Sequence, residues 1–227
     1  VLEDTILNQA IGINDTIIYN GQELQVRPAE TEWEDFNGIT GKIGANWNID
    51  EFNNIFFNTG VLSKAPRFNN VFNYDNQTYY NTKNELIKAF EIGYGYRSPK
   101  ISVNLNTYYT IWKNKPQAGS TTLDGGETAS YNINGINALH KGIELDLAWK
   151  ISKSFKYEFM SSIGDWKWTS GDTVNLYLNQ QLVATDYFDA SGVYVGDAPQ
   201  TQIGSSISYN FNKNVNTKSY IKLKGVY

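Results

Sequence analysis

The chain has 227 residues, with no cysteine, one histidine and a formal net charge of −4. The absence of cysteine excludes a disulfide framework, a thiolate metal site and a cysteine nucleophile, and a single histidine cannot build a histidine-rich zinc site. Lysine and arginine are scattered and form no basic stripe, so we expect no nucleic-acid partner.

The first part of the chain, residues 1–35, shows little periodicity. It is rich in Asn, Asp, Glu and Gln, and Pro28 interrupts any strand because proline cannot donate to a sheet ladder. We expect a long loop or irregular segment here. No run of about 20 apolar residues occurs in the chain, which argues against a transmembrane helix, and the first residues lack the features of a signal peptide.

From residue 38 onward, apolar and polar side chains alternate with period two, the repeat of a β-strand. The pattern is strongest in the segment 90–112, where Ile101, Val103 and Leu105 share one face and the intervening Ser and Asn residues share the other. Pro99 lies between the two halves of this segment, as is typical of a turn. In chain order the pattern predicts eight strands, at 38–48, 52–62, 90–96, 101–112, 139–150, 154–169, 200–211 and 218–227.

The connections between these strands alternate between short and long. Tight turns follow the first, third, fifth and seventh strands, whereas long connections at 63–84, 114–138 and 170–199 follow the others. Successive connections in an antiparallel barrel lie at opposite ends, so all long loops fall on one side. Outer-membrane barrels have this asymmetry, and their strands need about 9–11 residues. We therefore expect an all-β, antiparallel up-and-down transmembrane β-barrel.

Two other architectures fit parts of the pattern. A complete eight-stranded outer-membrane barrel with a binding or structural role would have an interior that side chains just fill. Small residues on the predicted inner face argue against it, because they would leave voids. A soluble carbohydrate-binding β-sandwich would need apolar packing on its inner layer, whereas the second faces of these strands are uniformly polar. The small inward residues are Gly93, Gly95, Ser102, Gly204 and Ser206.

Three stretches resemble TonB-dependent outer-membrane receptors. The first is the strand pair 38–47 and 54–60 followed by Ala65-Pro66, which in that family opens an extracellular loop. The second is 84–94, which begins near an acidic residue and ends in Gly-Tyr. The third is 138–146, with a Gly-aliphatic-Glu strand start at Gly142. Together the resemblance covers roughly residues 36–227.

The resemblance implies a larger barrel of the 22-stranded, plugged type, of which these eight strands are the C-terminal part. The family's plug domain and TonB-contacting segment are not found in this sequence. Residues 1–35 would be a long extracellular loop, and 36–227 would be barrel strands with short periplasmic turns and long extracellular loops. The implied function is active uptake across the bacterial outer membrane of a ferric chelate, a cobalamin-like compound or an oligosaccharide. The implied partners are outer-membrane lipid, the remaining strands, the plug and, through the plug, the TonB complex.

Catalysis is not expected. His140 lies at a strand start, and no Gly-x-Ser-x-Gly nucleophile motif is present. Glu144 and Asp146 share a face and are interpreted as charges that face a water-filled lumen. Asp124 and Glu127 lack the ligand spacing of a calcium loop. We therefore expect no enzymatic activity, no cofactor and no metal site.

Aromatic side chains near the long loops are the predicted ligand-binding residues. Planar rings offer large contact area to sugar faces and to the aromatic groups of iron chelates at a low entropic cost. The same rings could instead form an interfacial girdle at the level of lipid head groups, or pack within the loops. The candidates are Tyr79, Tyr80, Trp166, Trp168, Tyr177, Tyr187 and Tyr194.

Overall fold

The computed structural model describes residues 16–19, 22–25, 31–73, 76, 78–79, 82–178, 181–196, 198–211 and 219–227. In these ranges the regular structure is almost entirely antiparallel β-structure, and α1 (Phe68–Val71) is a single helical turn. None of the helical structure in these ranges is long and apolar enough to cross a membrane. β1 (Thr16–Tyr19) and β2 (Gln22–Gln25) pair with each other as a small separate hairpin.

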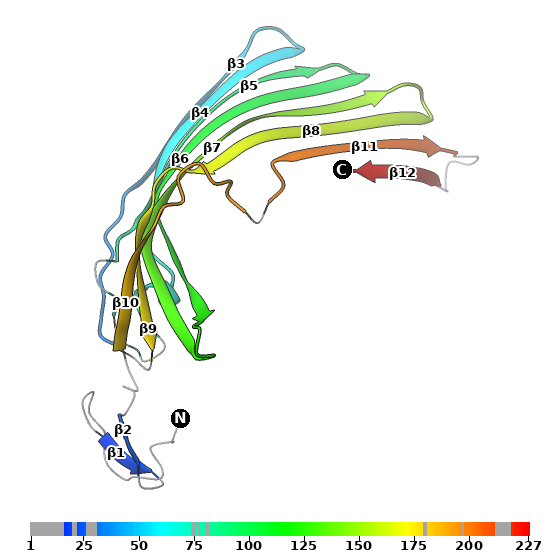
Figure 1. The fold of residues 1–227 in the computed structure, drawn as a ribbon. Coiled ribbons are helices and arrows are strands. Elements are labelled where there is room, and N and C mark those ends of the chain that lie inside the picture. Colours follow the sequence, from blue (N-terminus) through cyan, green and yellow to red (C-terminus); the bar gives the residue numbers. More distant parts are fainter. Residues whose placement is uncertain are drawn as a thin grey trace, which may run out of the picture.

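The main sheet is an up-and-down meander, in which each strand is antiparallel to the next along the chain. Figure 1 shows one open, strongly curved sheet. All eight strands predicted from the sequence are present in the predicted order, which confirms the all-β architecture. They are β3 (Thr40–Asn48), β4 (Asn53–Lys64), β5 (Glu85–Arg97), β6 (Ile101–Thr122), β7 (Thr128–Lys150), β8 (Phe155–Trp168), β11 (Thr201–Asn210) and β12 (Tyr220–Val226).

The two edge strands leave the sheet open. β3 pairs with β4 and β12 pairs with β11, and within the described residues neither edge strand has a second partner. Eight strands therefore form an arc and do not close into a small barrel of their own. An open arc of this kind is the shape expected for part of the wall of a larger barrel.

The connections between strands differ at the two ends of the main sheet. Short turns at 49–52, 98–100 and 151–154 lie at one end, which we call the turn end. The connections from β4 to β5, from β6 to β7 and from β8 to β11 lie at the opposite end, which we call the loop end. Longer connections follow β4 and β8, whereas only residues 123–127 join β6 to β7, and the turn predicted after the seventh strand lies outside the described residues.

The predicted loop at 114–138 is wrong over much of its length, because β6 continues to Thr122 and β7 begins at Thr128. Two register shifts interrupt the β6–β7 ladder between Trp112 and Gln117. Asn114 has a positive φ of 55° there, and Pro116 lies inside the strand. Bulges tolerate proline and leave residues unpaired, so the period-two pattern is lost where the strand itself continues.

The predicted loop at 170–199 also contains strands. β9 (Asp172–Leu178) pairs with β10 (Gln181–Phe188) and with the outer part of β7. This hairpin branches from the main sheet at the loop end. Beneath it lies a small apolar core of Ile133, Ile136 and Ala190, against which Trp168 and Val174 pack.

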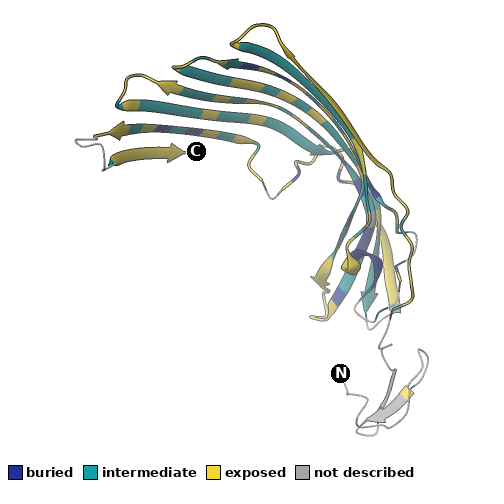
Figure 2. Ribbon diagram, turned by 180° about the vertical axis from the view of Figure 1, so that it is seen from behind, coloured by how far each residue is buried: buried dark blue, intermediate teal, exposed yellow. Residues whose placement is uncertain are grey.

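The two faces of the main sheet have opposite character, and Figure 2 shows exposed and half-buried residues alternating along its strands. We call one face the apolar face; many of its large side chains are exposed, including Ile43 and Trp47 at 68% and Leu223 at 73%. The other, the polar face, carries Asn, Ser, Gly and charged residues. Hollows of about 300, 460 and 310 Å³ lie over the polar face, so the sheet is recessed on that side.

Side chains from neighbouring strands cover several glycines of the polar face. The ring of Phe56 lies so close to Gly93, its cross-strand partner, that an added Cβ would come within 2.2 Å of it. Asn54 lies over Gly95 in the same way, with its Oδ1 at 2.3 Å from such a Cβ. These glycines therefore make room for larger neighbours, and the voids expected from their small size are partly filled.

Candidate functional site

A group of aromatic residues and one lysine lies on the polar face at the loop end, and we call it the aromatic cluster. The antiparallel register places these residues side by side. His140 pairs with both Thr110 and Trp166, and Ala138 pairs with both Trp112 and Trp168. Paired residues in a sheet share a face. Three adjacent strands, β6, β7 and β8, therefore bring together Tyr108, Trp112, Lys115, His140, Trp166 and Trp168.

The rings of the cluster form a row across the strands. The His140 ring lies 6.1 Å from the Trp112 ring and 5.6 Å from the Trp166 ring, with interplanar angles of 46° and 54°. Trp166 donates a hydrogen bond from Nε1 to the Tyr108 hydroxyl, at 2.7 Å. All four residues are half-buried, so each keeps part of its surface accessible.

Two paired glycines provide the space for this row. Gly142 and Gly164 lie opposite each other in β7 and β8. A Cβ added at Gly142 would lie 2.5 Å from the Tyr108 hydroxyl and 2.6 Å from the Ile163 carbonyl oxygen. A Cβ at Gly164 would lie 2.7 Å from Trp166 Nε1. The hydrogen bond between Tyr108 and Trp166 thus runs across a gap that only glycine leaves open.

Lys115 is the cation of the cluster. Its Nζ lies 4.5 Å from the centre of the Trp112 ring and 5.5 Å from that of Trp168, within the range of a cation–π interaction. Among the residues that the structure describes, no carboxylate lies within ion-pair distance of this ammonium. Within the described residues, the groups shown against this ammonium are the faces of two indoles.

Glu85 holds the Trp112 ring of this row in place through a hydrogen bond. Its side chain is buried, and it accepts hydrogen bonds from Trp112 Nε1 at 2.8 Å and from Lys64 Nζ at 2.7 Å. The pair with Lys64 neutralises the buried carboxylate, as a buried charge requires. Glu85 therefore orients Trp112 without adding net charge to the cluster.

The predicted candidates do not gather at one place. Trp166 and Trp168 belong to the aromatic cluster. Tyr194 lies on the apolar face, since it pairs with Lys167 and the Lys167 Nζ lies 5.1 Å from its ring. With 59% of its surface exposed, Tyr194 is placed as a girdle residue would be.

The tyrosines of the outer loops form a second group. Tyr79 is buried, and its ring lies 5.9 Å from that of Tyr177 in β9. Burial raises the pKa of Tyr177. This pair ties the connection between β4 and β5 to the β9–β10 hairpin. Tyr187 in β10 is 66% exposed, and Tyr80 lies outside the described residues.

Five residues of this site are not among the binding residues predicted from the sequence: Tyr108, Trp112, Lys115, His140 and Glu85. Tyr108 and Trp112 are in phase with the polar residues of β6, which is the one sequence pattern that could have pointed to them. Lys115 follows the bulge, where that phase is lost. Their proximity to His140 depends on the pairing register, which the sequence does not reveal.

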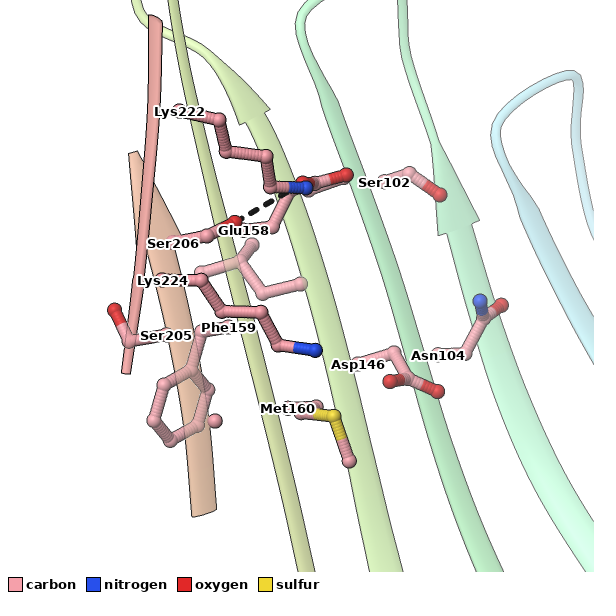
Figure 3. A pocket seen from close by; sticks show the side chains of 13 residues that line it. Ser102, Asn104, Asp146, Glu158, Phe159, Met160, Ser205, Ser206, Lys222 and Lys224 are labelled. Carbon is pink, nitrogen blue, oxygen red and sulfur yellow. Dashed lines mark hydrogen bonds and ion pairs between the residues drawn. The ribbon is translucent and has the colours of Figure 1, made fainter. Parts of the chain in front are cut away.

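A second constellation lies on the polar face nearer the turn end, where Figure 3 shows charged side chains around a hollow of about 300 Å³. Glu158 accepts hydrogen bonds from Lys222 Nζ at 2.7 Å and from the Ser206 hydroxyl at 3.1 Å, and it also pairs with Lys156. Asp146 and Lys224 line the same hollow. Glu158 is thus paired with two lysines, whereas no ion pair is found for Asp146 or Lys224 among the described residues.

Metal binding has little support in this part of the molecule. Across the described ranges, no group of three His, Asp or Glu side chains is arranged to hold a metal ion. The aromatic cluster offers ring faces, one hydroxyl and one ammonium, which suit an organic ligand better than a bare cation.

This chain was compared with known proteins by sequence, by structure and by family. No curated protein matches the chain. Among solved structures, the copper transporter OprC is similar at 13% identity, with a TM-score of 0.49; the match covers 82% of this chain and 32% of that one. This chain thus spans about a third of that protein's length. The family model for the TonB-dependent receptor-like β-barrel matches residues 15–224. The chain belongs to the TonB-dependent receptor β-barrel family.

Proposed function

We propose that these strands form part of the wall of an outer-membrane receptor that imports a bulky nutrient in a TonB-dependent manner. Ligand classes consistent with such a receptor are ferric chelates, cobalamin-like compounds and oligosaccharides. The aromatic cluster is the proposed contact site for the ligand. The observation that carries the proposal is the position of the cluster, on the polar face of the sheet and at the loop end.

The apolar face supports a membrane location. In β6 the residues from Ile101 to Tyr109 cover roughly 27 Å along the strand, at about 3.4 Å per residue, close to the apolar band of about 25 Å on outer-membrane barrels. At the loop-end limit of that band, where Lys141 pairs with Tyr109, the apolar face carries Lys141, Asp165 and Lys167, which form ion pairs at 3.3 and 3.1 Å. Such charges are far less costly at the level of lipid head groups than in hydrocarbon.

Aromatic residues mark the opposite limit of the band. On the apolar face near the turn end, the rings of Phe155, Tyr209 and Phe211 pack in sequence at 4.6 and 6.0 Å. Trp47 and Trp149 also lie on that face and are exposed. Aromatic girdles take this position in outer-membrane barrels. We infer that the turn end is periplasmic and that the loop end, with residues 1–35, is extracellular.

The remaining partners follow from this assignment. The open edges of β3 and β12 are proposed to pair with further strands of the same barrel, because unpaired edges are unfavourable in lipid. The polar face, with its hollows, is proposed to border a plug through which the TonB complex acts. No enzymatic activity is proposed for these residues.

Uptake by cells tests the proposal. The full-length receptor is produced in a strain that lacks it, and uptake of a labelled ferric chelate, cobalamin and oligosaccharide is followed with and without TonB. We expect uptake of one class, lost without TonB, and lowered by about tenfold in a Trp166→Ala/Trp168→Ala variant because central aromatic anchors dominate binding energies. Trp149→Ala, on the apolar face, is the matched control and should retain uptake. Uptake that is independent of TonB would contradict the proposed function.

A further inference from the structure

The apolar face of the main sheet carries its lysines at the loop end. Lys88 lies on β5, Lys113 on β6, Lys141 on β7 and Lys167 on β8, and these four strands are neighbours in the sheet (Figure 1). Within the described strands of the main sheet, the apolar face has no lysine nearer the turn end. Asp165 is the one carboxylate that the described part of this region contains, so positive charge exceeds negative charge there.

In the hairpin of β7 and β8, a carboxylate links the two lysines. Lys141 and Asp165 are cross-strand partners, and Lys167 lies two residues beyond Asp165 on β8, diagonal to Lys141. Diagonal neighbours of this kind stand about 7–8 Å apart on one face of a sheet. Both ammonium groups reach the carboxylate, Lys141 at 3.3 Å and Lys167 at 3.1 Å. Here the protein itself supplies the anion between two neighbouring cations.

The hairpin of β5 and β6 repeats this arrangement without the carboxylate. Lys88 pairs with Ile111, and Lys113 lies two residues beyond Ile111 on β6. An isoleucine therefore occupies the place that corresponds to Asp165 in the neighbouring hairpin. Lys88 and Lys113 are exposed, and neither has a carboxylate within ion-pair distance among the residues that the structure describes. Because two like charges at this spacing repel each other, the pair is favourable for an anion from outside the chain.

The surroundings of this pair are apolar on one side only. The apolar band extends in β6 from Ile101 to Tyr109, and Lys113 follows it toward the loop end. On the turn-end side of the pair, Phe90 and Tyr109 are cross-strand partners and are 44% and 46% exposed. A molecule that satisfies both features has a negatively charged group followed by hydrocarbon. Free anions offer only the charge, whereas anionic membrane lipids offer both.

We propose that Lys88 and Lys113 together bind the head group of a membrane lipid that carries a terminal phosphate monoester, in the leaflet at the loop end. Such a phosphate has a charge of about −1.5 to −2 at neutral pH and three acceptor oxygens, which match two ammonium groups better than a singly charged diester does. The acyl chains of the lipid lie along the apolar face beside Phe90 and Tyr109. This inference goes beyond the proposed function, because the lipid site lies on the face opposite the aromatic cluster and shares with it only the membrane placement of the sheet.

Native mass spectrometry of the full-length receptor in detergent tests the proposal by counting bound lipids. The probes are dioleoyl phosphatidic acid, which has a terminal phosphate monoester, dioleoyl phosphatidylcholine, whose head group is zwitterionic, and inorganic phosphate as a competitor. Lys88→Met/Lys113→Met removes both charges and keeps the apolar stems, whereas Lys88→Arg/Lys113→Arg keeps the charges. Lys42→Met/Lys224→Met is the matched control, because both of these lysines are exposed and lie on the polar face.

The neighbouring hairpin suggests two further variants. Ile111→Asp places a carboxylate where Asp165 stands in the other hairpin, so it should engage both lysines of β5 and β6 and exclude the lipid phosphate. Asp165→Asn removes the carboxylate from the other pair, so it should create a second site of the same kind on β7 and β8. Thermal unfolding of each variant in detergent shows whether it is folded.

We expect phosphatidic acid to bind about tenfold more tightly than phosphatidylcholine, and about tenfold more weakly to Lys88→Met/Lys113→Met than to the natural protein. The arginine variant and the polar-face control should bind it normally, Ile111→Asp should bind it weakly, and Asp165→Asn should hold one more molecule. The proposal is overturned if the two lipids bind equally, if Lys88→Met/Lys113→Met or Ile111→Asp binds phosphatidic acid as the natural protein does, if the control loses as much affinity, or if excess inorganic phosphate displaces the lipid. Uptake that is independent of TonB would contradict the proposed function and leave this lipid site in place.

Discussion

Gly142 shows how a single missing side chain shapes the site. The Tyr108 hydroxyl and the Ile163 carbonyl oxygen both lie within 2.6 Å of the position that a Cβ would occupy. The hydroxyl belongs to a side chain and can move, but the carbonyl is part of the β8 backbone and cannot. The row of rings therefore depends on the absence of a side chain at Gly142. The alternating pattern of the sequence shows only that this residue is small.

We predict that Gly142→Ala lowers the free energy of unfolding by about 1–3 kcal/mol, the usual cost of inserting a carbon into a filled space. It should also break the hydrogen bond from Trp166 to Tyr108. Thermal unfolding in detergent measures the first effect, and tryptophan fluorescence reports the second. Gly41→Ala is the control, because no atom lies within 4 Å of its added Cβ. Equal behaviour of the two variants would show that the glycine is not needed for packing.

Glu85 is a second residue whose role follows from its contacts. It is only 4% exposed and accepts from both Lys64 and Trp112. We predict that Glu85→Ala destabilises the protein by about 2–3 kcal/mol, because a buried donor and a cation lose their acceptor. Glu85→Gln should cost less, since the amide oxygen still accepts from the indole. Denaturation midpoints of the two variants measure the difference, and a larger loss for Gln than for Ala would refute this account.

At the scale of elements, the eight strands of the main sheet could be predicted because apolar and polar side chains alternate along most of their length. β6 is the instructive exception, since its alternation stops at the bulge near Asn114 while the strand continues to Thr122. β9 and β10 were missed because short strands among Asn, Gly and Asp resemble loops. The aromatic cluster itself could be predicted only in part: Trp166 and Trp168 are visible in the sequence, but the register that sets His140 between Trp112 and Trp166 is a property of three paired strands.

The Tyr79–Tyr177 contact connects two elements that lie far apart in the sequence. Tyr79 is buried against the ring of Tyr177 at 5.9 Å. We predict that Tyr177→Ala loosens the connection between β4 and β5, so that protease cuts residues 65–84 several-fold faster, because local opening governs cleavage. Tyr187→Ala is the control, as that ring is largely exposed. Fragment mass spectrometry after limited digestion identifies the cut sites, and unchanged cleavage in Tyr177→Ala would mean that other contacts hold this connection.

At the scale of the whole molecule, the two faces of the main sheet differ in the chemistry of their side chains. The apolar face shows large exposed side chains on all eight strands, and the polar face carries hydrogen-bonded charges such as Glu158 with Lys222. A water-soluble protein rarely exposes an apolar patch of this extent. Tryptophans lie on both faces, so their fluorescence can test which face contacts lipid and which face borders the lumen.

Variants that retain one of the six tryptophans, with the others replaced by phenylalanine, separate the two environments. In bilayers of lipids brominated near the head-group end of the acyl chain, bromine quenches only nearby indoles. We predict strong quenching of Trp47 and Trp149, which are exposed on the apolar face, and little quenching of Trp112 and Trp166. A water-soluble quencher such as acrylamide should show the reverse order. If bromine quenched Trp166 and spared Trp47, the lipid-facing and lumen-facing sides would have to be exchanged, and the aromatic cluster could not be the ligand site.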